Sequence, residues 1–281
     1  MASLREAQAR FRQQKQMADP GKQWDLFYKN HQVNFFKDRH WIDREFPDLR
    51  PRNSDDDSSL PPSRSRPLTR LLEIGCGVGN FSFPLLALNP EMMVYMCDFS
   101  PRAIGHVLAN PQYTNEFAGR CHAFVADIVN DDLTATIAPD SLDLVSAIFC
   151  LSALAPDDLP AALDNIARVL KPGGRLLFRD YVVGDQAEVR FAESNKVPGH
   201  AHLYLRTDGT MSHFFEPDGL AEAMSRAGLR RLDEALVEKT VVNQRQGKQF
   251  DRRWLQARYV KQDGSTADRI VASESCSHTT T

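Results

Sequence analysis

The chain has 281 residues, 42% hydrophobic and 25% charged, which is an ordinary composition for a globular protein of one domain with appendages, or at most two domains. Its net charge of −3, from 34 basic and 37 acidic residues, does not indicate a strongly basic nucleic-acid-binding chain, although a local basic patch can still bind phosphate. No apolar run approaches the ~20 residues of a membrane span. The five cysteines include no Cys-x-x-Cys pair, so neither a disulfide framework nor a zinc site is indicated.

The first 49 residues are expected to form an N-terminal segment outside the main sheet. Residues 1–20 predict a polar helix that lacks the apolar core of a secretory signal, and Glu6 and Asp19 argue against a mitochondrial presequence. Residues 22–49 combine many aromatic side chains with interleaved Lys, Arg and His, a pattern typical of a core or of a lid over a binding site.

Free thiols favour a reducing compartment, so we expect a cytoplasmic or nuclear protein.

Two polar stretches divide the rest of the chain. Residues 50–67 are rich in Pro, Ser and Asp and predict a flexible linker, and residues 263–281 predict a disordered tail. Residues 68–262 are therefore expected to form the catalytic domain.

A glycine-rich turn follows the first predicted strand of that domain. The strand, residues 71–74, continues into Gly75, Gly77 and Gly79. Glycines let the backbone approach a bound ligand closely, because a Cβ would collide with it. A dinucleotide site usually has Gly-x-Gly-x-x-Gly, but Asn80 stands where the last glycine of that motif belongs. The pattern therefore predicts a nucleotide-binding turn and disfavours a dinucleotide.

Acidic residues end the next two predicted strands. The strand at residues 93–97 stops at Asp98, whose carboxylate can accept both hydroxyls of a ribose, and the strand at 122–126 stops at Asp127. An acid at that position can accept from an adenine amino group while Ile128 packs on the ring. Each acid could instead cap a strand or begin a turn. Both together, after the glycine turn, predict an adenosine-containing cofactor.

Strands and helices alternate to the end of the domain. Further strands are expected at residues 142–149, 175–179, 232–242 and 254–261, and helices after Ser100, at 156–170 and at 217–228. This order predicts an α/β fold, a doubly wound and mostly parallel seven-stranded sheet with an N-terminal helical lid. The last two strands are expected to be antiparallel neighbours at the sheet edge.

Four blocks resemble the eukaryotic tRNA 3-methylcytidine methyltransferases, a family of class I enzymes that use S-adenosylmethionine. These blocks are WDLFYKNHQVNFFKDRHWIDREF, CDFSPRAI, LKPGGRLLFRDY and RTDGTMSHFF. The similarity runs from about Trp24 to Lys261 and looks closest to the short cytosolic branch that modifies serine tRNAs, although the linker is longer than that pattern suggests. The resemblance implies methylation of N3 of a cytidine in the anticodon loop, position 32 of serine tRNAs. It also implies tRNA as partner and suggests seryl-tRNA synthetase as a second one.

The resemblance implies a set of cofactor-binding residues: Trp24, Tyr28, Gly75, Gly77, Asp98, Asp127, Ile128 and Ile148. From the residues alone, the two aromatic side chains could simply pack a helix onto the domain, and Ile148 could be strand core.

Cytosine N3 carries a lone pair and no proton, so it can attack the sulfonium methyl group without a general base. The product is cationic, and a carboxylate beside it stabilises the developing charge. Asp180 follows the fifth strand and is proposed to contact the cytosine edge, although a turn residue or an ion pair with Arg179 or Arg175 explains it nearly as well. The target base must leave its stack to reach such a pocket.

The remaining expected substrate contacts are aromatic, basic or polar. Tyr181, or Phe35 and Phe36, would stack on the base, with Phe35 and Arg39 placed in the catalytic group; Lys37, Arg39, His40 and Arg206 would bind the RNA. A basic group near the end of the chain, which includes Arg252 and Arg253, is interpreted as a solvated face. His200 and His202 lack the partners of a metal site, so no metal is expected.

Other functions remain open at this level. The same fold serves small-molecule and protein methyltransferases. A non-catalytic RNA-binding scaffold could keep the fold, although both predicted acids are intact, and a dinucleotide dehydrogenase is disfavoured by Asn80.

Overall fold

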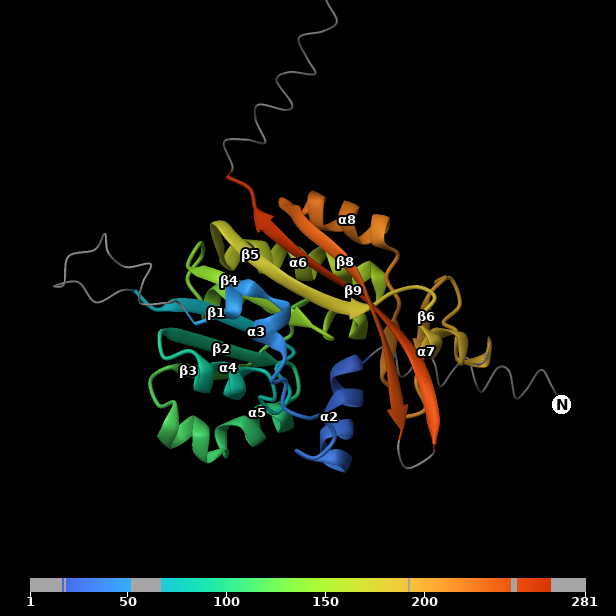
Figure 1. The fold of residues 1–281 in the computed structure, drawn as a ribbon, viewed down its shortest axis with the longest axis horizontal. Helices are drawn as coiled ribbons and strands as arrows, with labels where there is room; N and C mark the ends of the chain where they lie inside the picture. Colours follow the sequence, from blue (N-terminus) through green and yellow to red (C-terminus); the bar gives the residue numbers. More distant parts are fainter. Residues whose placement is uncertain (1–16, 18, 52–66, 192, 244–246, 264–281) are drawn as a thin grey trace, which may run out of the picture.

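The computed structural model describes residues 17, 19–51, 67–191, 193–243 and 247–263, so the predicted N-terminal polar helix lies almost wholly outside these residues, as do most of the 50–67 linker and nearly all of the 263–281 tail. A seven-stranded sheet with the order β3-β2-β1-β4-β5-β9-β8 forms the centre of the molecule (Figure 1). The parallel strands are β1 (Thr69–Ile74), β2 (Met92–Asp98), β3 (Cys121–Val125), β4 (Leu142–Ile148) and β5 (Leu170–Tyr181). The antiparallel pairings of β9 (Lys248–Lys261) with β5 and with β8 (Leu229–Asn243) complete the sheet.

The connections between strands are mostly helical. The α-helices are α2 (Pro20–His31), α3 (Ile42–Glu45), α4 (Ser82–Leu88), α5 (Pro101–Leu108), α6 (Leu159–Val169), α7 (Gln186–Val189) and α8 (Pro217–Arg226). Short turns of other helix types are η1 (Pro47–Leu49), η3 (Gln112–Glu116), η4 (Leu133–Ala135), η5 (Leu151–Ala153), η6 (Pro156–Asp158) and η7 (Glu193–Asn195). A separate two-stranded sheet pairs β6 (Leu203–Leu205) with β7 (Met211–His213).

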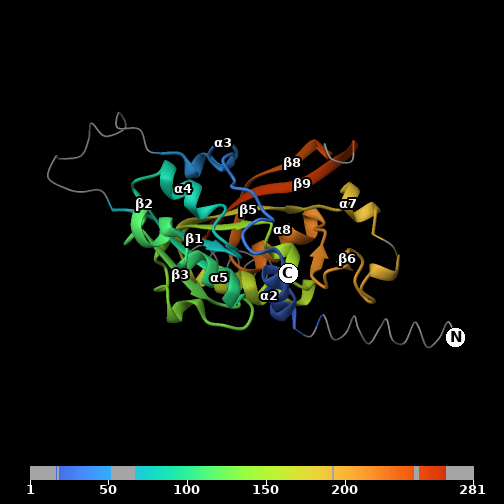
Figure 2. The ribbon, with the colours of Figure 1, turned by 90° about the horizontal axis from the view of Figure 1, so that it is seen from below.

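The sheet is buried on both faces because neighbouring apolar side chains along each strand point to opposite sides. Leu72, Val145 and Leu176 pack in one hydrophobic cluster with residues of α6 and α8. Their neighbours Leu71, Leu144 and Leu177 pack in a second cluster with residues of α3, α4 and α5. Figure 2 shows α3 and α4 on the same side of the sheet. This arrangement confirms the doubly wound prediction.

Several boundaries differ from the sequence-based prediction. The strand expected to reach Phe149 ends at Ile148, because Phe149 has a φ of +55°. The helix expected to include Leu170 ends one residue earlier, since Leu170 already pairs with Leu142 as the start of β5. The last two strands are longer than expected but are antiparallel neighbours, as predicted.

Helix α2 of the N-terminal segment lies at the carboxyl ends of the parallel strands, whereas α3 packs on one face of the sheet (Figure 1). Asp25 of α2 accepts hydrogen bonds from the hydroxyl of Ser100 at 3.0 Å and from Nε of Arg102 at 2.7 Å, next to the end of β2. These contacts fix α2 against the edge of the sheet where open α/β folds bind ligands.

Candidate active site

A cavity of about 340 Å³ opens at the carboxyl ends of β1, β2, β4 and β5, between the sheet, the N-terminal segment and β9. The predicted site residues that line it are Trp24, Tyr28, Phe36, Lys37, Arg39, Gly75, Gly77, Asp98, Asp127, Ile128, Tyr181 and Arg206. The fold thus gathers into one space most of the residues that the sequence singles out.

Asp98 ends β2 against the glycine turn and is only 5% exposed. Its Oδ2 accepts the backbone N–H of Gly77 at 2.9 Å, and its Oδ1 accepts that of Ser100 at 2.9 Å. Burial raises the pKa of Asp98 to about 6, and the two amide hydrogen bonds oppose that rise. The carboxyl group is therefore held at a fixed place in the cavity wall and is mostly ionised at neutral pH.

The three turn glycines have positive φ angles, and protein side chains fill the space beside each. A Cβ on Gly75 would lie 2.5 Å from Sγ of Cys150, and one on Gly77 would lie 2.6 Å from the hydroxyl oxygen of Tyr28. A Cβ on Gly79 would lie 2.4 Å from the ring of Phe83. Packing within the protein therefore already requires these glycines, in addition to any close approach of a ligand.

Trp24 contributes a polar group that has no partner in the protein. Its indole Nε1 is buried and makes no hydrogen bond within the described part of the chain, yet Trp24 lines the cavity. A buried N–H without an acceptor costs free energy, and a bound molecule in the cavity can supply that acceptor.

Arg39 connects the N-terminal segment to two parts of the sheet edge. Its backbone N–H donates to the carbonyl of Asn80 at 2.8 Å, and its Nη1 donates to the carbonyl of Ile148 at 2.9 Å. Asn80 also donates from Nδ2 to Asp38 at 2.9 Å. Asn80, whose place in the sequence only disfavours a dinucleotide, therefore ties the segment to the glycine turn.

Asp127 and Ile128 lie at another side of the same cavity. Asp127 accepts the backbone N–H of Val129 at 2.9 Å through Oδ1 and the Nδ2 amide of Asn130 at 2.8 Å through Oδ2. Carboxylate oxygens have further lone pairs, so both atoms can still accept from a ligand. Ile128 is buried and presents an apolar wall next to the carboxylate.

Asp180 lies directly behind the cavity wall rather than in it, and it is fully buried. Its Oδ2 accepts the backbone N–H of Ser152, a lining residue, and its Oδ1 accepts that of Tyr181, each at 2.9 Å. Burial raises its pKa to about 6, and these hydrogen bonds together with the charge of Arg206 oppose the rise. No ion pair joins Asp180 to Arg175 or Arg179 in the described structure.

Besides Asp180, three predicted residues do not line the cavity. Phe35 is 53% exposed and packs edge-on against Phe27 and Phe36, so its expected stacking on the base has no support in this arrangement. The exposed His40 does not line the cavity. The side chain of Ile148 is core, and its backbone carbonyl, not its side chain, faces Arg39.

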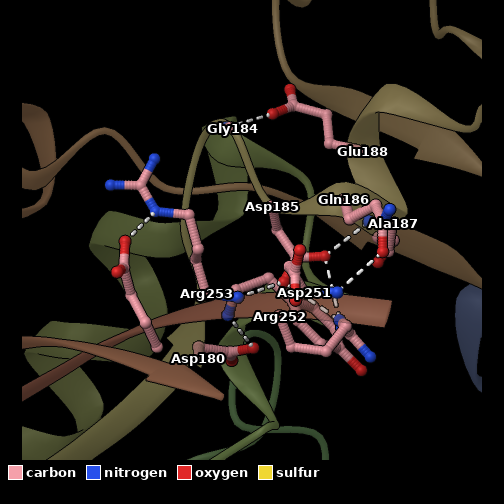
Figure 3. Close-up of polar contacts among 12 residues, drawn as sticks. Asp180, Gly184, Asp185, Gln186, Ala187, Glu188, Asp251, Arg252 and Arg253 are labelled. Carbon is pink, nitrogen blue, oxygen red and sulfur yellow. Dashed lines mark hydrogen bonds and ion pairs between the residues drawn. The ribbon is translucent and has the colours of Figure 1, made fainter. Parts of the chain in front are cut away.

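Sequence reasoning missed the wall that β9 supplies. Arg252 and Trp254 line the cavity, so Arg252 does not belong to a purely solvated face. Both oxygens of the fully buried Asp185 accept from Nε of Arg252 at 3.0 Å, and Asp185 also accepts the backbone N–H groups of Arg253 and Ala187 (Figure 3). The guanidinium lies 5.4 Å from the centre of the Tyr181 ring. No local pattern reveals this, because the pairing of Tyr181 with Trp254 joins distant parts of the chain.

Glu73, before the glycine turn, also lines the cavity and was not singled out. It accepts from the hydroxyl of Ser82 at 2.5 Å, and burial raises its pKa to about 8, against the opposing effects of Arg39 and Ser82. Glu73 lies inside the apolar run of the first strand, and nothing in that run marks its carboxylate as part of a binding site.

Comparisons with known proteins identify the fold and the family. Residues 72–176 match a model described as a methyltransferase domain. A SAM-dependent methyltransferase from Methanosarcina mazei superposes with a TM-score of 0.54 over 73% of this chain and 99% of its own, at 16% identity, which speaks for the fold alone. The tRNA N(3)-cytidine methyltransferase METTL6 of Homo sapiens is 44% identical over 89% of this chain and 84% of its own length. The tRNA N(3)-methylcytidine methyltransferase trm141 of Schizosaccharomyces pombe is 40% identical over 85% of this chain and 92% of its own.

A glycine turn and two strand-end acids around one cavity, on this sheet order, define a class I S-adenosylmethionine-dependent methyltransferase. The chain belongs to the tRNA N(3)-cytidine methyltransferase family.

The residues present fit S-adenosylmethionine. The carboxylates of Asp98 and Asp127 match the hydroxyl and amino donors of an adenosyl group, and the apolar face of Ile128 suits its ring. The unpartnered indole N–H of Trp24 can donate to an acceptor atom of the cofactor. In the described part of the chain, no three His, Cys, Asp or Glu side chains gather to hold a metal ion. Among the same residues, no helix is long and apolar enough to cross a membrane.

Proposed function

We propose that this chain transfers the methyl group of S-adenosylmethionine to N3 of a cytidine in tRNA. One observation carries the proposal: a single cavity joins a cofactor wall, which holds Asp98 and Asp127, to a cationic and aromatic acceptor wall, which holds Tyr181, Arg206 and Arg252. The first wall suits the cofactor, and the second suits a planar base with its adjoining phosphates. Membership of the tRNA N(3)-cytidine methyltransferase family supports the same reaction.

Within this proposal the protein acts mainly by positioning. S-adenosylmethionine supplies an electrophilic methyl group on a sulfonium, and cytosine N3 supplies the lone pair, so no protein base is required. Asp98 holds the ribose and Asp127 with Ile128 the adenine, while Tyr28 and Trp24 cover the cofactor from α2. Asp180 places a negative charge behind the acceptor wall, where it stabilises the positive charge that develops on the base.

The finer substrate assignment is also a proposal. We propose that the target is cytidine 32 in the anticodon loop of serine tRNAs and that seryl-tRNA synthetase assists in presenting it. The N-terminal segment, residues 19–49, supports RNA binding because Lys37, Arg39 and the exposed aromatic side chain of Phe36 line the cavity. Cations bind phosphate, and aromatic faces stack on unpaired bases.

Methylation of unmodified bulk tRNA with labelled S-adenosylmethionine tests the proposal. The RNA is digested to nucleosides after incubation with and without seryl-tRNA synthetase, and the Asp98→Ala variant serves as the blank. We expect label in 3-methylcytidine, increased by the synthetase. Label in a different nucleoside would reject the assigned atom, and an unchanged yield with the synthetase would reject the assigned partner.

A further inference from the structure

Phe149 has a backbone conformation that is unfavourable for its bulky side chain. In the described residues, three non-glycine positions have positive φ: Gln32 at +51°, Asp140 at +53° and Phe149 at +55°. Asp140 lies in an exposed turn, where a polar residue adopts this conformation readily, and Gln32, with a ψ of −131°, is the exposed residue at which α2 ends. A large aromatic residue has no such tolerance, and persistent strain of this kind clusters at functional sites.

The strain is confined to one residue at the end of β4. The N–H of Phe149 still donates to the carbonyl of Arg179 at 2.7 Å, so the pairing with β5 continues to this point. The chain then turns into η5, where Ser152 donates its N–H to Asp180. A glycine at 149 would allow the same turn without strain. The turn therefore explains the positive φ but not the phenylalanine.

The phenylalanine ring lies at the acceptor wall. Phe149 lines the cavity, and its ring centre is 5.4 Å from that of Tyr181 and 5.9 Å from that of Trp254. The guanidinium of Arg39, anchored on the carbonyl of Ile148, lies 5.7 Å from the ring centre. These neighbours belong to the acceptor side of the cavity and not to α2, which covers the cofactor side.

We infer that Phe149 is a substrate-binding residue of the acceptor wall, on whose ring the extruded target base stacks. This inference rests on the proposed function, because it presupposes that the acceptor is a base. The backbone conformation fixes the position of the ring in the cavity, and the neighbouring side chains of Tyr181, Trp254 and Arg39 restrict its rotation. A preorganised aromatic face binds the base without an added ordering cost.

Three substitutions separate the ring from the turn. Phe149→Gly removes the ring and relieves the strain, Phe149→Leu removes the aromatic face but keeps the bulk and the strain, and Phe149→Tyr keeps both. The matched control, Asp140→Gly, relieves a similar φ in an exposed turn remote from the cavity. The measurements are the thermal midpoint, S-adenosylhomocysteine affinity by calorimetry, and kcat and KM for tRNA.

We expect Phe149→Gly and Phe149→Leu to lose on the order of tenfold to a hundredfold in kcat/KM for tRNA, the size of one lost base–aromatic stack. Their S-adenosylhomocysteine affinities should stay near that of the wild type. Phe149→Tyr, which keeps the aromatic face, should retain more kcat/KM for tRNA than Phe149→Leu, and the control Asp140→Gly should turn over normally. If the glycine variant fails to fold, the leucine variant decides.

Wild-type turnover in Phe149→Gly or Phe149→Leu would overturn the inference, and so would a loss of S-adenosylhomocysteine affinity as large as the loss of turnover. These results differ from failure of the proposed function, in which the wild-type protein itself makes no 3-methylcytidine. In that case the role of Phe149 in stacking on a target base is rejected together with the proposed function.

Discussion

The hydroxyl oxygen of Tyr28 lies 2.6 Å from the place that a Cβ on Gly77 would occupy. Tyr28 belongs to the N-terminal helix α2 and Gly77 to the glycine turn of the sheet, so this contact seats the lid on the cofactor side of the cavity. No larger residue at 77 can coexist with this position of the tyrosine.

We therefore expect Gly77→Ala to displace Tyr28 and to weaken S-adenosylhomocysteine binding by about tenfold or more, since overpacking a filled site costs about 1–3 kcal/mol. Gly119→Ala is the matched control, because Gly119 also has a positive φ but has nothing within 4 Å of its Cβ position. Adding Tyr28→Phe to Gly77→Ala removes the hydroxyl, so that the nearest remaining ring atom, Cζ, lies 3.5 Å from the Cβ position at 77. This double variant should recover part of the S-adenosylhomocysteine affinity. Equal losses in Gly77→Ala and Gly119→Ala would show that backbone strain, not the clash, is responsible.

The raised pKa of Asp98, about 6, makes cofactor binding depend on pH. Ribose hydroxyls donate to a carboxylate, so S-adenosylhomocysteine affinity should fall as the pH drops below about 6, by up to about tenfold per pH unit. The free energy of unfolding responds in the opposite direction, because the pKa of Asp98 in the folded protein is raised above its ordinary value of 3.8. The stabilising effect of protonated Asp98 is complete below pH 3.8 and is lost as the pH rises through about 6.

Calorimetry between about pH 5 and about pH 7, with Asp98→Asn beside the wild type, measures this effect on affinity. The amide cannot titrate, so the slope should disappear in the variant. A slope that persists in Asp98→Asn would assign the effect to another group.

Asp180 is expected to affect methyl transfer and not cofactor binding. Replacing it with asparagine removes the negative charge behind the acceptor wall and should lower kcat by about 10²–10³-fold, similar to the loss of one preorganised electrostatic group of an active site. The exposed Asp164→Asn on α6 is the control. Single-turnover kinetics with bound cofactor gives the answer, and unaltered turnover in Asp180→Asn would leave Asp180 with a structural role only.

Asp185 is expected to act through Arg252 as a positioning residue. Removing the buried carboxylate in Asp185→Ala leaves the Arg252 guanidinium and two backbone N–H groups without their acceptor, which should destabilise the fold by about 3 kcal/mol. The freed arginine should raise KM for tRNA more than it lowers S-adenosylhomocysteine affinity. Glu238→Ala, which breaks the exposed pair with Arg253 on the same hairpin, should change neither quantity. Equal KM values in the two variants would contradict the role of Asp185.

The sequence alone is sufficient to predict the sheet class, the family, and the meeting of Gly77, Asp98 and Asp127 at one cavity. Strand, glycine turn and terminal acid are contiguous signals, so the sequence pattern by itself places Gly77, Asp98 and Asp127 at one edge of the sheet, where the cavity lies. The exposed outward position of Phe35 is not predictable in this way, because aromatic density alone does not say which ring faces a cavity.

The acceptor wall does not follow from such contiguous signals. Arg252 and Trp254 reach the cavity only because β9 pairs with β5 in a register that sets Trp254 opposite Tyr181. The positive φ of Phe149 is equally hidden, since an apolar run gives no sign of the residue at which the strand turns away. Long-range register and local strain are properties of the folded chain, not of short segments.

Mass-spectrometric nucleoside analysis of a serine tRNA transcript tests the central claim most directly. The transcript is incubated with the protein, S-adenosylmethionine and seryl-tRNA synthetase, beside a second transcript in which uridine replaces cytidine 32. We expect one added methyl group, recovered as 3-methylcytidine, in the first transcript and none in the second. A methyl group on any other nucleoside, or an unmethylated first transcript although S-adenosylhomocysteine binds, would contradict the account.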